Sequence, residues 1–228
     1  MAWAPADLED VCGIVHPQHR RRGIGRRLLH AVREEGRGLQ LRSLRTVSDA
    51  ASPSGGPFLT EMGLVHVGSE QRLELDVAAF ERAGSRVGHV PDTFVLSRAG
   101  DEDLELLVGL QTVVFGDSPA VTRAMVRRGL ADPARSYYIA RVGGTPVGML
   151  RVGEWAHGAD VTAFGVRPEY RGRSYGRSIL TEAVATLIAK GWDRISLEVE
   201  TDNAPALALY GSCGFTATRT YNYHEGGV

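Results

Sequence analysis

The sequence is poor in cysteine, in net charge and in long apolar runs, and each scarcity excludes a class of protein. Cys12 and Cys213 are the only cysteines in 228 residues, so neither a disulfide framework nor a cysteine metal site is expected. The 26 basic and 27 acidic residues leave a net charge of −1, which argues against a nucleic-acid coat or membrane-surface binder. No apolar run approaches the roughly 20 residues that span a bilayer. We therefore expect a soluble, cytoplasmic protein with no metal and with neither nucleic acid nor membrane as partner.

The composition that is present is typical of a folded globular protein. Hydrophobic residues make up 43% and charged residues 23%, and 28 glycines and 10 prolines are spread along the chain. This fits neither disorder nor a collagen or coiled coil. The length suffices for one large domain or two small ones, each with a buried core.

A gapless internal repeat relates the start of the chain to its second half. Residues 11–29 (VCGIVHPQHRRRGIGRRLL) align with residues 162–180 (TAFGVRPEYRGRSYGRSIL) at a constant offset of 151 residues. Each copy reads as an apolar strand, a proline turn, a basic glycine loop and an amphipathic helix. The matched positions include Val15 with Val166, Pro17 with Pro168, Arg20 with Arg171 and Gly25 with Gly176.

The glycine loop of each copy is predicted to bind a pyrophosphate. Each helix starts within its loop, where unpaired backbone N–H groups and the positive end of the helix dipole attract an anion. Glycine lets a bulky phosphate approach, and arginines add positive charge. These are Arg171, Arg173 and Arg177 in the second copy, and Arg20, Arg21, Arg22, Arg26 and Arg27 in the first.

Two other interpretations of these loops stay open. The run Arg20–Arg22 is also typical of a nucleic-acid contact, although the chain has no net positive charge and no interleaved aromatic surface. A glycine loop before a helix is also compatible with a tight turn, which the second copy in register makes a weaker explanation. Neither Gly-Lys-Ser/Thr nor Gly-x-Gly-x-x-Gly is present, so known nucleotide loops of those kinds are excluded.

A strand and a tyrosine-bearing helix follow the second loop. Residues 194–200 (RISLEVE) alternate as a strand, and TDNAPALALYGSCGF predicts a helix with Asp202 or Asn203 as N-cap and an end near Gly214. Tyr210 lies almost two turns after Asn203, so both point the same way. Tyr210 is therefore either a core residue with its hydroxyl at the rim or a group at the mouth between strands. Asn203 is expected mainly to cap the helix.

These motifs together resemble the GNAT family of acetyl-CoA-dependent N-acyltransferases. The residues that carry the resemblance are V-x-P-x-x-R-G-x-S-x-G-R and the later N-A-P-A-L-A-L-Y-x-x-x-G-F. It implies an α/β fold with a mixed, mostly antiparallel twisted sheet flanked by helices. A complete copy would occupy residues 92–228, a partial copy residues 1–82, and a linker residues 83–91. This layout suggests tandem GNAT proteins of the mycothiol synthase type.

The partial copy would lack about 60 residues and the tyrosine. Counting back by the repeat offset puts Leu59 at the position of Tyr210 and Ser52, a plausible helix cap, at the position of Asn203. The half-sheet would also leave an exposed edge, which a partner or a second copy of the chain in a homodimer would cover. We predict packing, dimer formation or a second CoA site without chemistry for this half.

The resemblance assigns roles within the complete copy. Tyr210 would protonate the departing thiolate as general acid. Asp160 would act as a base through water, with Glu154 and His157 as rivals, although Asp160 also suits a solvated strand-end charge. The main chain near Val166 would bind pantetheine and the thioester oxygen. The residues expected to hold acetyl-CoA, the co-substrate, are Val166, Arg171, Gly172, Arg173, Ser174, Tyr175, Gly176, Arg177 and Asn203.

Ser174 departs from the family pattern, because glycine is usual there and Gly23 holds the position in the other copy. The acceptor is less defined. Asp117, Glu154 and Asp160 would lie beside the site, which mildly favours a cationic amine; small metabolites, antibiotics, polyamines and protein N-termini are all candidates. We predict an N-acetyltransferase that moves an acetyl group from acetyl-CoA to a primary amine by direct attack. The alternative is a non-catalytic acyl-CoA-binding sensor or assembly module.

Overall fold

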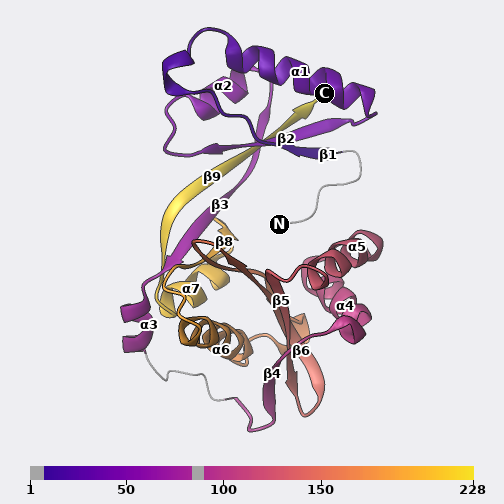
Figure 1. The fold of residues 1–228 in the computed structure, drawn as a ribbon, viewed down its shortest axis with the longest axis vertical. Helices are drawn as coiled ribbons and strands as arrows, with labels where there is room; N and C mark the ends of the chain where they lie inside the picture. The colour runs from indigo at the N-terminus through magenta and orange to yellow at the C-terminus, as the bar shows by residue number, and fades with distance from the viewer. Residues whose placement is uncertain (1–7, 84–89) are drawn as a thin grey trace. The chain divides into compact units, whose positions relative to one another are not determined.

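The computed structural model describes residues 8–83 and 90–228, which contain both strands and helices (Figure 1). The strands are β1 (Leu8–Val11), β2 (Ser43–Asp49), β3 (Val65–Leu75), β4 (Phe94–Arg98), β5 (Arg135–Val142), β6 (Thr145–Trp155), β7 (Gly158–Val166), β8 (Ile195–Glu200) and β9 (Phe215–Gly227). The helices are α1 (Ile24–Gly38), α2 (Gly55–Glu61), α3 (Val77–Ala83), α4 (Leu104–Phe115), α5 (Pro119–Leu130), α6 (Tyr175–Ala189) and α7 (Ala204–Ser212).

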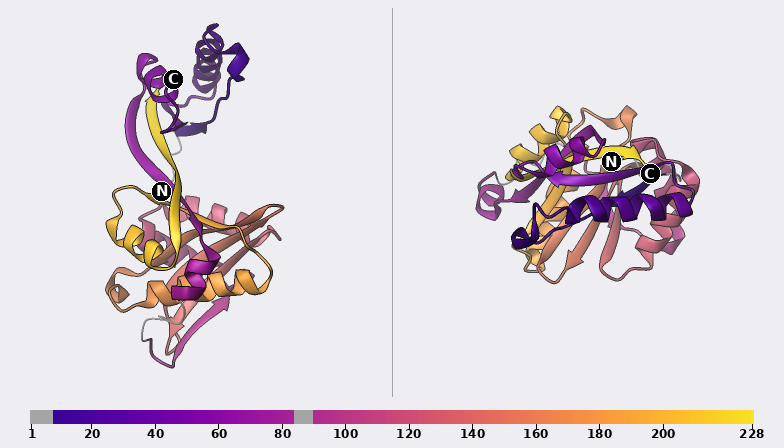
Figure 2. Two further views of the ribbon diagram at one scale, coloured as in Figure 1. Left: turned by 90° about the vertical axis from the view of Figure 1, so that its left-hand side faces the viewer. Right: turned by 90° about the horizontal axis from the view of Figure 1, so that it is seen from above.

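The strands form one open, mixed sheet in the described part of the chain. Their order is β1-β2-β9-β3-β8-β7-β6-β5-β4, and β3 and β9 run side by side (Figure 2). Neighbours from β4 to β7 pair antiparallel, as do β2 and β9, whereas β1 with β2 and β7 with β8 pair parallel. The predicted α/β class with a mixed, mostly antiparallel sheet is confirmed.

Contacts divide the described residues into two compact units. The first contains residues 73–199 and 203–217, and the second contains residues 8–72, 200–202 and 218–228. The end of β9 groups with the N-terminal repeat because it pairs with β2 from Asp49–Tyr221 to Ser43–Gly227. Helix α3 ends at Ala83, where the predicted linker begins, and residues 84–89 of that linker lie outside the described residues. The domain boundaries at 82 and 92 stay a prediction.

The sheet of the first unit is covered on both faces, because alternate side chains of each strand point to opposite sides. Leu150 of β6 is buried in a cluster with Ile179 of α6. Its neighbour Met149 is buried on the other side, with Leu107 of α4 and Val126 of α5. Figure 1 shows α6 and α7 on one side of these strands and α4 and α5 on the other. We call the two sides the α6 face and the α4 face.

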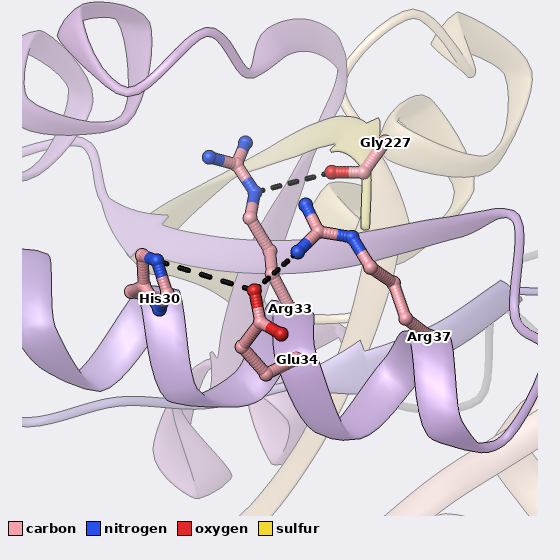
Figure 3. A network of polar contacts seen from close by, with 5 residues as sticks. All are labelled: His30, Arg33, Glu34, Arg37 and Gly227. Carbon is pink, nitrogen blue, oxygen red and sulfur yellow. Dashed lines mark hydrogen bonds and ion pairs between the residues drawn. The ribbon is translucent and has the colours of Figure 1, made fainter.

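The second unit has its own smaller core, in which Leu29 of α1, Leu44 of β2 and Leu59 of α2 are buried together. Figure 3 shows how α1 is also fastened to the C-terminal strand. Arg33 Nε donates a hydrogen bond of 3.1 Å to the carbonyl oxygen of Gly227. The chain end therefore contributes to the fold of the N-terminal repeat.

Gly148 of β6 lies where β6, β7 and α6 pack closely together. A Cβ atom here would lie 2.7 Å from the carbonyl oxygen of Gly165 and 2.9 Å from Cδ1 of Ile179. We expect Gly148→Ala to lower the free energy of unfolding by about 1–3 kcal/mol, measured by urea denaturation. The matched control is Gly109→Ala on α4, where a Cβ meets no atom within 4 Å; it should be neutral or stabilising. Equal effects of the two substitutions would contradict this packing.

Candidate active site

In the first unit, the neighbouring strands β7 and β8 are paired over only part of their length. Residues 159–161 of β7 pair with residues 195–197 of β8, and beyond them β7 pairs with β6 alone as far as Val166. The backbone of β7 carries one extra residue there, and Ala163 has a left-handed φ of 45°. Such a bulge bends a strand and interrupts its pairing. Within the described chain, the edge of β7 that faces away from β6 thus has amide and carbonyl groups with no strand partner.

The loop after β7 presents a row of unpaired amides. The amide of Arg171 donates to the carbonyl of Pro168, and that of Ser178 donates to the carbonyl of Ser174. Among the described residues, the amides between them, 172–177, have no backbone acceptor. These six amides include the first turn of α6, so the positive end of a 15-residue helix adds to them. The predicted pyrophosphate loop therefore has the hydrogen-bond donors that an anion needs.

Ser174 adopts the conformation that the glycine of the family pattern would adopt. It is the N-cap of α6 with a φ of 63°, and its side chain makes no capping hydrogen bond. A left-handed serine costs roughly 1–2 kcal/mol relative to glycine. The backbone conformation of the loop is retained in spite of the substitution.

The arginines of the second loop have different partners. Arg171 Nε donates to the carbonyl of Val166 at 3.0 Å, which braces the loop against the end of β7. Arg177 Nη2 donates to Ser212 Oγ at 2.6 Å, so this side chain ties α6 to α7. The guanidinium of Arg173 lies over the ring of Tyr170. Of the three, Arg173 makes no hydrogen bond to the described protein.

Tyr175 and Asn203 both make contacts within the protein beside the loop. The Tyr175 ring is buried and stacked on Phe94, so only its amide faces the loop. The Asn203 side chain accepts a hydrogen bond of 3.2 Å from the amide of Ala206, which makes it the N-cap of α7. Its predicted capping role is confirmed, and that bond already engages the side-chain oxygen.

Tyr210 lies beside the parted strands. Its side chain is buried, with 7% exposed, and its ring centroid is 6.1 Å from that of Phe164 on β7. Burial raises the pKa of Tyr210 to about 12, so the phenol keeps its proton throughout the neutral range. Its hydroxyl makes no hydrogen bond to another described residue. A protonated, unengaged phenol is a suitable proton donor.

Gly176 marks the point where the loop, β7 and α7 meet. A Cβ atom on Gly176 would lie 3.4 Å from Leu209 on α7, 3.7 Å from Val166 and 3.8 Å from Phe164. The amide row, the open edge of β7 and the helix that carries Tyr210 are therefore adjacent. This juxtaposition brings together most of the residues predicted to bind the cofactor and the predicted acid.

The two predicted carboxylates lie at the other end of β7. Glu154 accepts hydrogen bonds from Lys190 Nζ at 2.6 Å and Trp192 Nε1 at 2.8 Å. Lys190 follows the last residue of α6, roughly 22 Å along the helix from its loop. Asp160 is nearer, because it precedes the last residue of β7 that pairs with β8. Its carboxylate accepts a hydrogen bond from Trp155 Nε1. The rival base, His157, is exposed in the turn between β6 and β7.

The first copy of the loop has nearly the same backbone conformation as the second. Arg20 and Arg171 both have φ −66° and ψ 162°. Arg20 Nε donates to the carbonyl of Val15 at 3.1 Å, as Arg171 does to Val166. Left-handed residues follow at matched positions, namely Arg21 (61°) with Gly172 (75°) and Gly23 (73°) with Ser174 (63°).

Helix α2 has the place in the first copy that α7 has in the second, but it carries no counterpart of Tyr210. Ser52 Oγ accepts a hydrogen bond of 3.1 Å from the amide of Gly55, the first residue of α2, although Ser54 and not Ser52 is the N-cap residue. Arg26 Nη2 donates to Glu61 at 2.6 Å, the counterpart of the tie between Arg177 and Ser212. Leu59 is buried where the other copy has Tyr210. The N-terminal copy thus has the amide row and the helix tie but no proton donor at that position.

Comparison with known proteins identifies the family. The family model described as the acetyltransferase (GNAT) family matches residues 9–54 and 106–215. A mycothiol acetyltransferase from Clavibacter michiganensis subsp. michiganensis is 31% identical over 209 residues, which cover 89% of this chain and 67% of that protein. The chain belongs to the GNAT acetyltransferase family. It spans about two thirds of the length of that relative.

Solved GNAT structures share the fold. A GCN5-related N-acetyltransferase from Sphaerobacter thermophilus superimposes with a TM-score of 0.78 at 19% identity, covering 96% of this chain and 73% of the other. A tandem GNAT protein from the clavulanic acid biosynthesis pathway gives 0.74 at 21% identity, covering 94% and 73%. The predicted resemblance to tandem GNAT proteins is confirmed, and GNAT acetyltransferases use acetyl-CoA as co-substrate.

Two further classes of site have no counterpart in what the structure describes. No group of three or more His, Cys, Asp or Glu side chains in residues 8–83 and 90–228 is arranged to hold a metal ion. Over the same ranges, no helix combines the length and the apolar character needed to cross a membrane.

Sequence reasoning missed one carboxylate in this GNAT site. Glu198 is the first residue of β8 beyond the part that pairs with β7, and it is exposed. Its neighbours Leu197 and Val199 are buried on the α6 face, so Glu198 projects from the α4 face. The alternation of residues 194–200 contained this signal, because it places Ser196, Glu198 and Glu200 on one side of the strand.

Glu154 is expected to stabilise the fold and not to act as the base. Hydrogen bonding to Lys190 lowers the pKa of Glu154 below its ordinary value of 4.5, and the bond from Trp192 lowers it further. Because the folded-state pKa is lowered, the pair stabilises the protein above about pH 4.5, and this contribution disappears as the pH falls through the folded pKa. We expect Glu154→Gln to cost about 1 kcal/mol at pH 7 and progressively less as the pH falls through the folded pKa, measured by chemical denaturation at a series of pH values. A large loss of acetyl transfer in Glu154→Gln would contradict this assignment.

Proposed function

We propose that this GNAT acetyltransferase transfers the acetyl group of acetyl-CoA to a primary amine, with Tyr210 as the proton donor. The observation that carries the proposal is the meeting of the amide row, the open edge of β7 and Tyr210 around Gly176. Each part alone has a structural explanation. Their adjacency supplies an anion cradle, a hydrogen-bonding edge and an acid in one place.

The residues present fit the pyrophosphate and pantetheine of acetyl-CoA. The amides of residues 172–177 would hold the pyrophosphate, supported by the α6 dipole and by the exposed Arg173. The open edge of β7 up to Val166 would bind the pantetheine amides, as a neighbouring strand would. Bound acetyl-CoA supplies an acyl thioester as the electrophile.

The chain's own residues would then manage the protons. As the C–N bond forms and the C–S bond breaks, Tyr210 would donate its phenol proton to the departing thiolate. The attacking ammonium must first lose a proton. Asp160 and Glu198, which both project from the α4 face near the parting strands, are the candidate acceptors of that proton, directly or through water. Glu154 is held away from this position by Lys190 and Trp192.

The acceptor is proposed to be a small molecule with a primary amine, with a protein N-terminus as the other candidate. The name of the mycothiol acetyltransferase relative supports a small-molecule acceptor. We keep the non-catalytic acyl-CoA-binding module as the alternative for the whole chain. That alternative predicts tight CoA binding with no amine acetylated.

Substitution of Tyr210 by phenylalanine separates chemistry from binding. We expect Tyr210→Phe to lower kcat by about 100-fold or more, because the thiolate then leaves without a proton donor. The affinity for CoA, measured by calorimetry, should stay within a few-fold. Tyr221→Phe on β9, which removes a hydroxyl in the second unit, is the control and should keep full turnover. An unchanged kcat in Tyr210→Phe would remove this acid from the mechanism.

For the N-terminal unit we propose a second CoA site without chemistry. The matching loop dihedral angles and the tie from Arg26 to Glu61 favour this over a packing role alone. Calorimetry should then count two CoA per chain. Gly25→Val, whose side chain would press on Phe58, should remove one of them and keep acetyl transfer. Gly176→Val should remove the other together with acetyl transfer. A single CoA per chain, unaffected by Gly25→Val, would leave the unit a packing or dimer-forming role.

A further inference from the structure

Arg151 projects from the α4 face next to the bulge of β7. It is opposite Thr162 in the pairing of β6 with β7 and opposite Tyr137 in the pairing with β5. Met149, two residues earlier on β6, is buried with α4 and α5, which fixes the face. Arg151 Nε donates to Thr162 Oγ1 at 2.9 Å, and the guanidinium lies over the Tyr137 ring, 5.9 Å from its centroid. The side chain is therefore oriented by contacts on both sides.

Among the described residues, the charge of Arg151 has no carboxylate partner. None of the ion pairs between described residues includes Arg151, and its only hydrogen bond uses Nε, so both terminal nitrogens lack an acceptor in the described chain. Arg135 on the neighbouring strand β5, by contrast, pairs with Asp132 at 3.1 Å. A partly buried guanidinium without a counter-ion is costly, because it loses water without gaining an equivalent partner. The two terminal nitrogens of Arg151 can therefore donate hydrogen bonds to the oxygens of an anion.

The surrounding charges define which anion fits. The two terminal nitrogens of a guanidinium match the two oxygens of one carboxylate, and a single positive charge balances that monoanion. Asp160 occupies the diagonal position to Arg151 across β6 and β7, roughly 7–8 Å away between Cα atoms, and the two form no ion pair. Glu198 projects from the same face on β8. Negative groups on one side and a positive group on the other suit a ligand that carries both charges.

We propose that Arg151 binds a carboxylate of the acceptor, so that the acceptor is an amino acid or a similar small zwitterion whose amine is directed to the parting strands. This rests on the proposed N-acetyl transfer and adds the class of its acceptor. The acidic residues beside the site then attract the ammonium group, while Arg151 selects among amines. Arg151 acts as a specificity residue and takes no part in proton transfer.

The test compares free L-amino acids with their C-terminal amides as acceptors, following thiol release. The native protein should prefer the carboxylate by about 10- to 100-fold in kcat/KM, the range for loss of a charge-assisted hydrogen-bond pair. Arg151→Gln should abolish the preference through KM, with kcat for the amino acid retained. Arg151→Glu should shift the preference toward diamines, which a purely structural arginine would not do. Arg128→Gln on α5, an exposed position, removes the same charge and should keep the native preference.

A binding experiment tests the proposed carboxylate site without requiring turnover. N-acetyl amino acids and their amides are titrated by calorimetry into the chain saturated with CoA, with CoA affinity and thermal unfolding as checks of folding. The N-acetyl amino acid should bind about 10- to 100-fold tighter than its amide, and Arg151→Gln should remove the difference. If the N-acetyl amino acid binds more tightly than its amide, but no amine is acetylated, the proposed function fails and the carboxylate site stands. Equal binding and equal turnover of acid and amide, or a preference that survives in Arg151→Gln, overturns the inference.

Discussion

The site depends on backbone groups that regular structure leaves without partners. A strand edge or a helix start normally finds a hydrogen-bond partner, because a buried unpaired amide is costly. Here the extra residue at Ala163 releases β7 from β8, and the left-handed Gly172 and Ser174 hold six amides in a row at the start of α6. A ligand with several acceptor groups in a line is the natural partner of such a surface. The side chains of the loop serve mainly to keep the backbone in this form.

The arginine side chains of the second loop make different contacts from one another. Arg171 fastens the loop to the end of β7, and Arg177 fastens α6 to α7, the helix that carries Tyr210. If either guanidinium instead contacted phosphate directly, loop position and acid position would be less constrained relative to each other. Precise placement of an acid relative to a leaving group contributes to rate through orientation. In the proposed function, Arg171 and Arg177 would therefore act by positioning the loop and the helices, and Arg173 would be the arginine left to support the phosphate.

The sequence predicted the loop conformation, the Asn203 cap and the helix that carries Tyr210 because each depends on local chemistry. The repeat offset aligned not only the loops but also Ser52 with Asn203, and each side chain accepts a hydrogen bond from an amide at the start of the following helix. The carboxylates were harder, since Glu154 is held by Lys190 and Trp192, which are 36 and 38 residues away and which no local pattern connects to it. Glu198 was overlooked because its significance depends on where β7 and β8 stop pairing, and register is not visible in a single strand.

The two copies separate the loop proposed to bind a ligand from the residue proposed to carry out the chemistry. In the N-terminal copy the tie between Arg26 and Glu61 is a charge pair, whereas its counterpart joins Arg177 to a serine. Both copies thus join the helix after the loop to the next helix, by an ion pair in one copy and by a hydrogen bond in the other. The resulting arrangement of the two helices is what the copies share. Leu59 fills the volume of Tyr210 with an apolar side chain that packs as well but donates no proton. Both positions are buried, and the open, bulged strand beside Tyr210 is what would give its hydroxyl a chemical use in the proposed function.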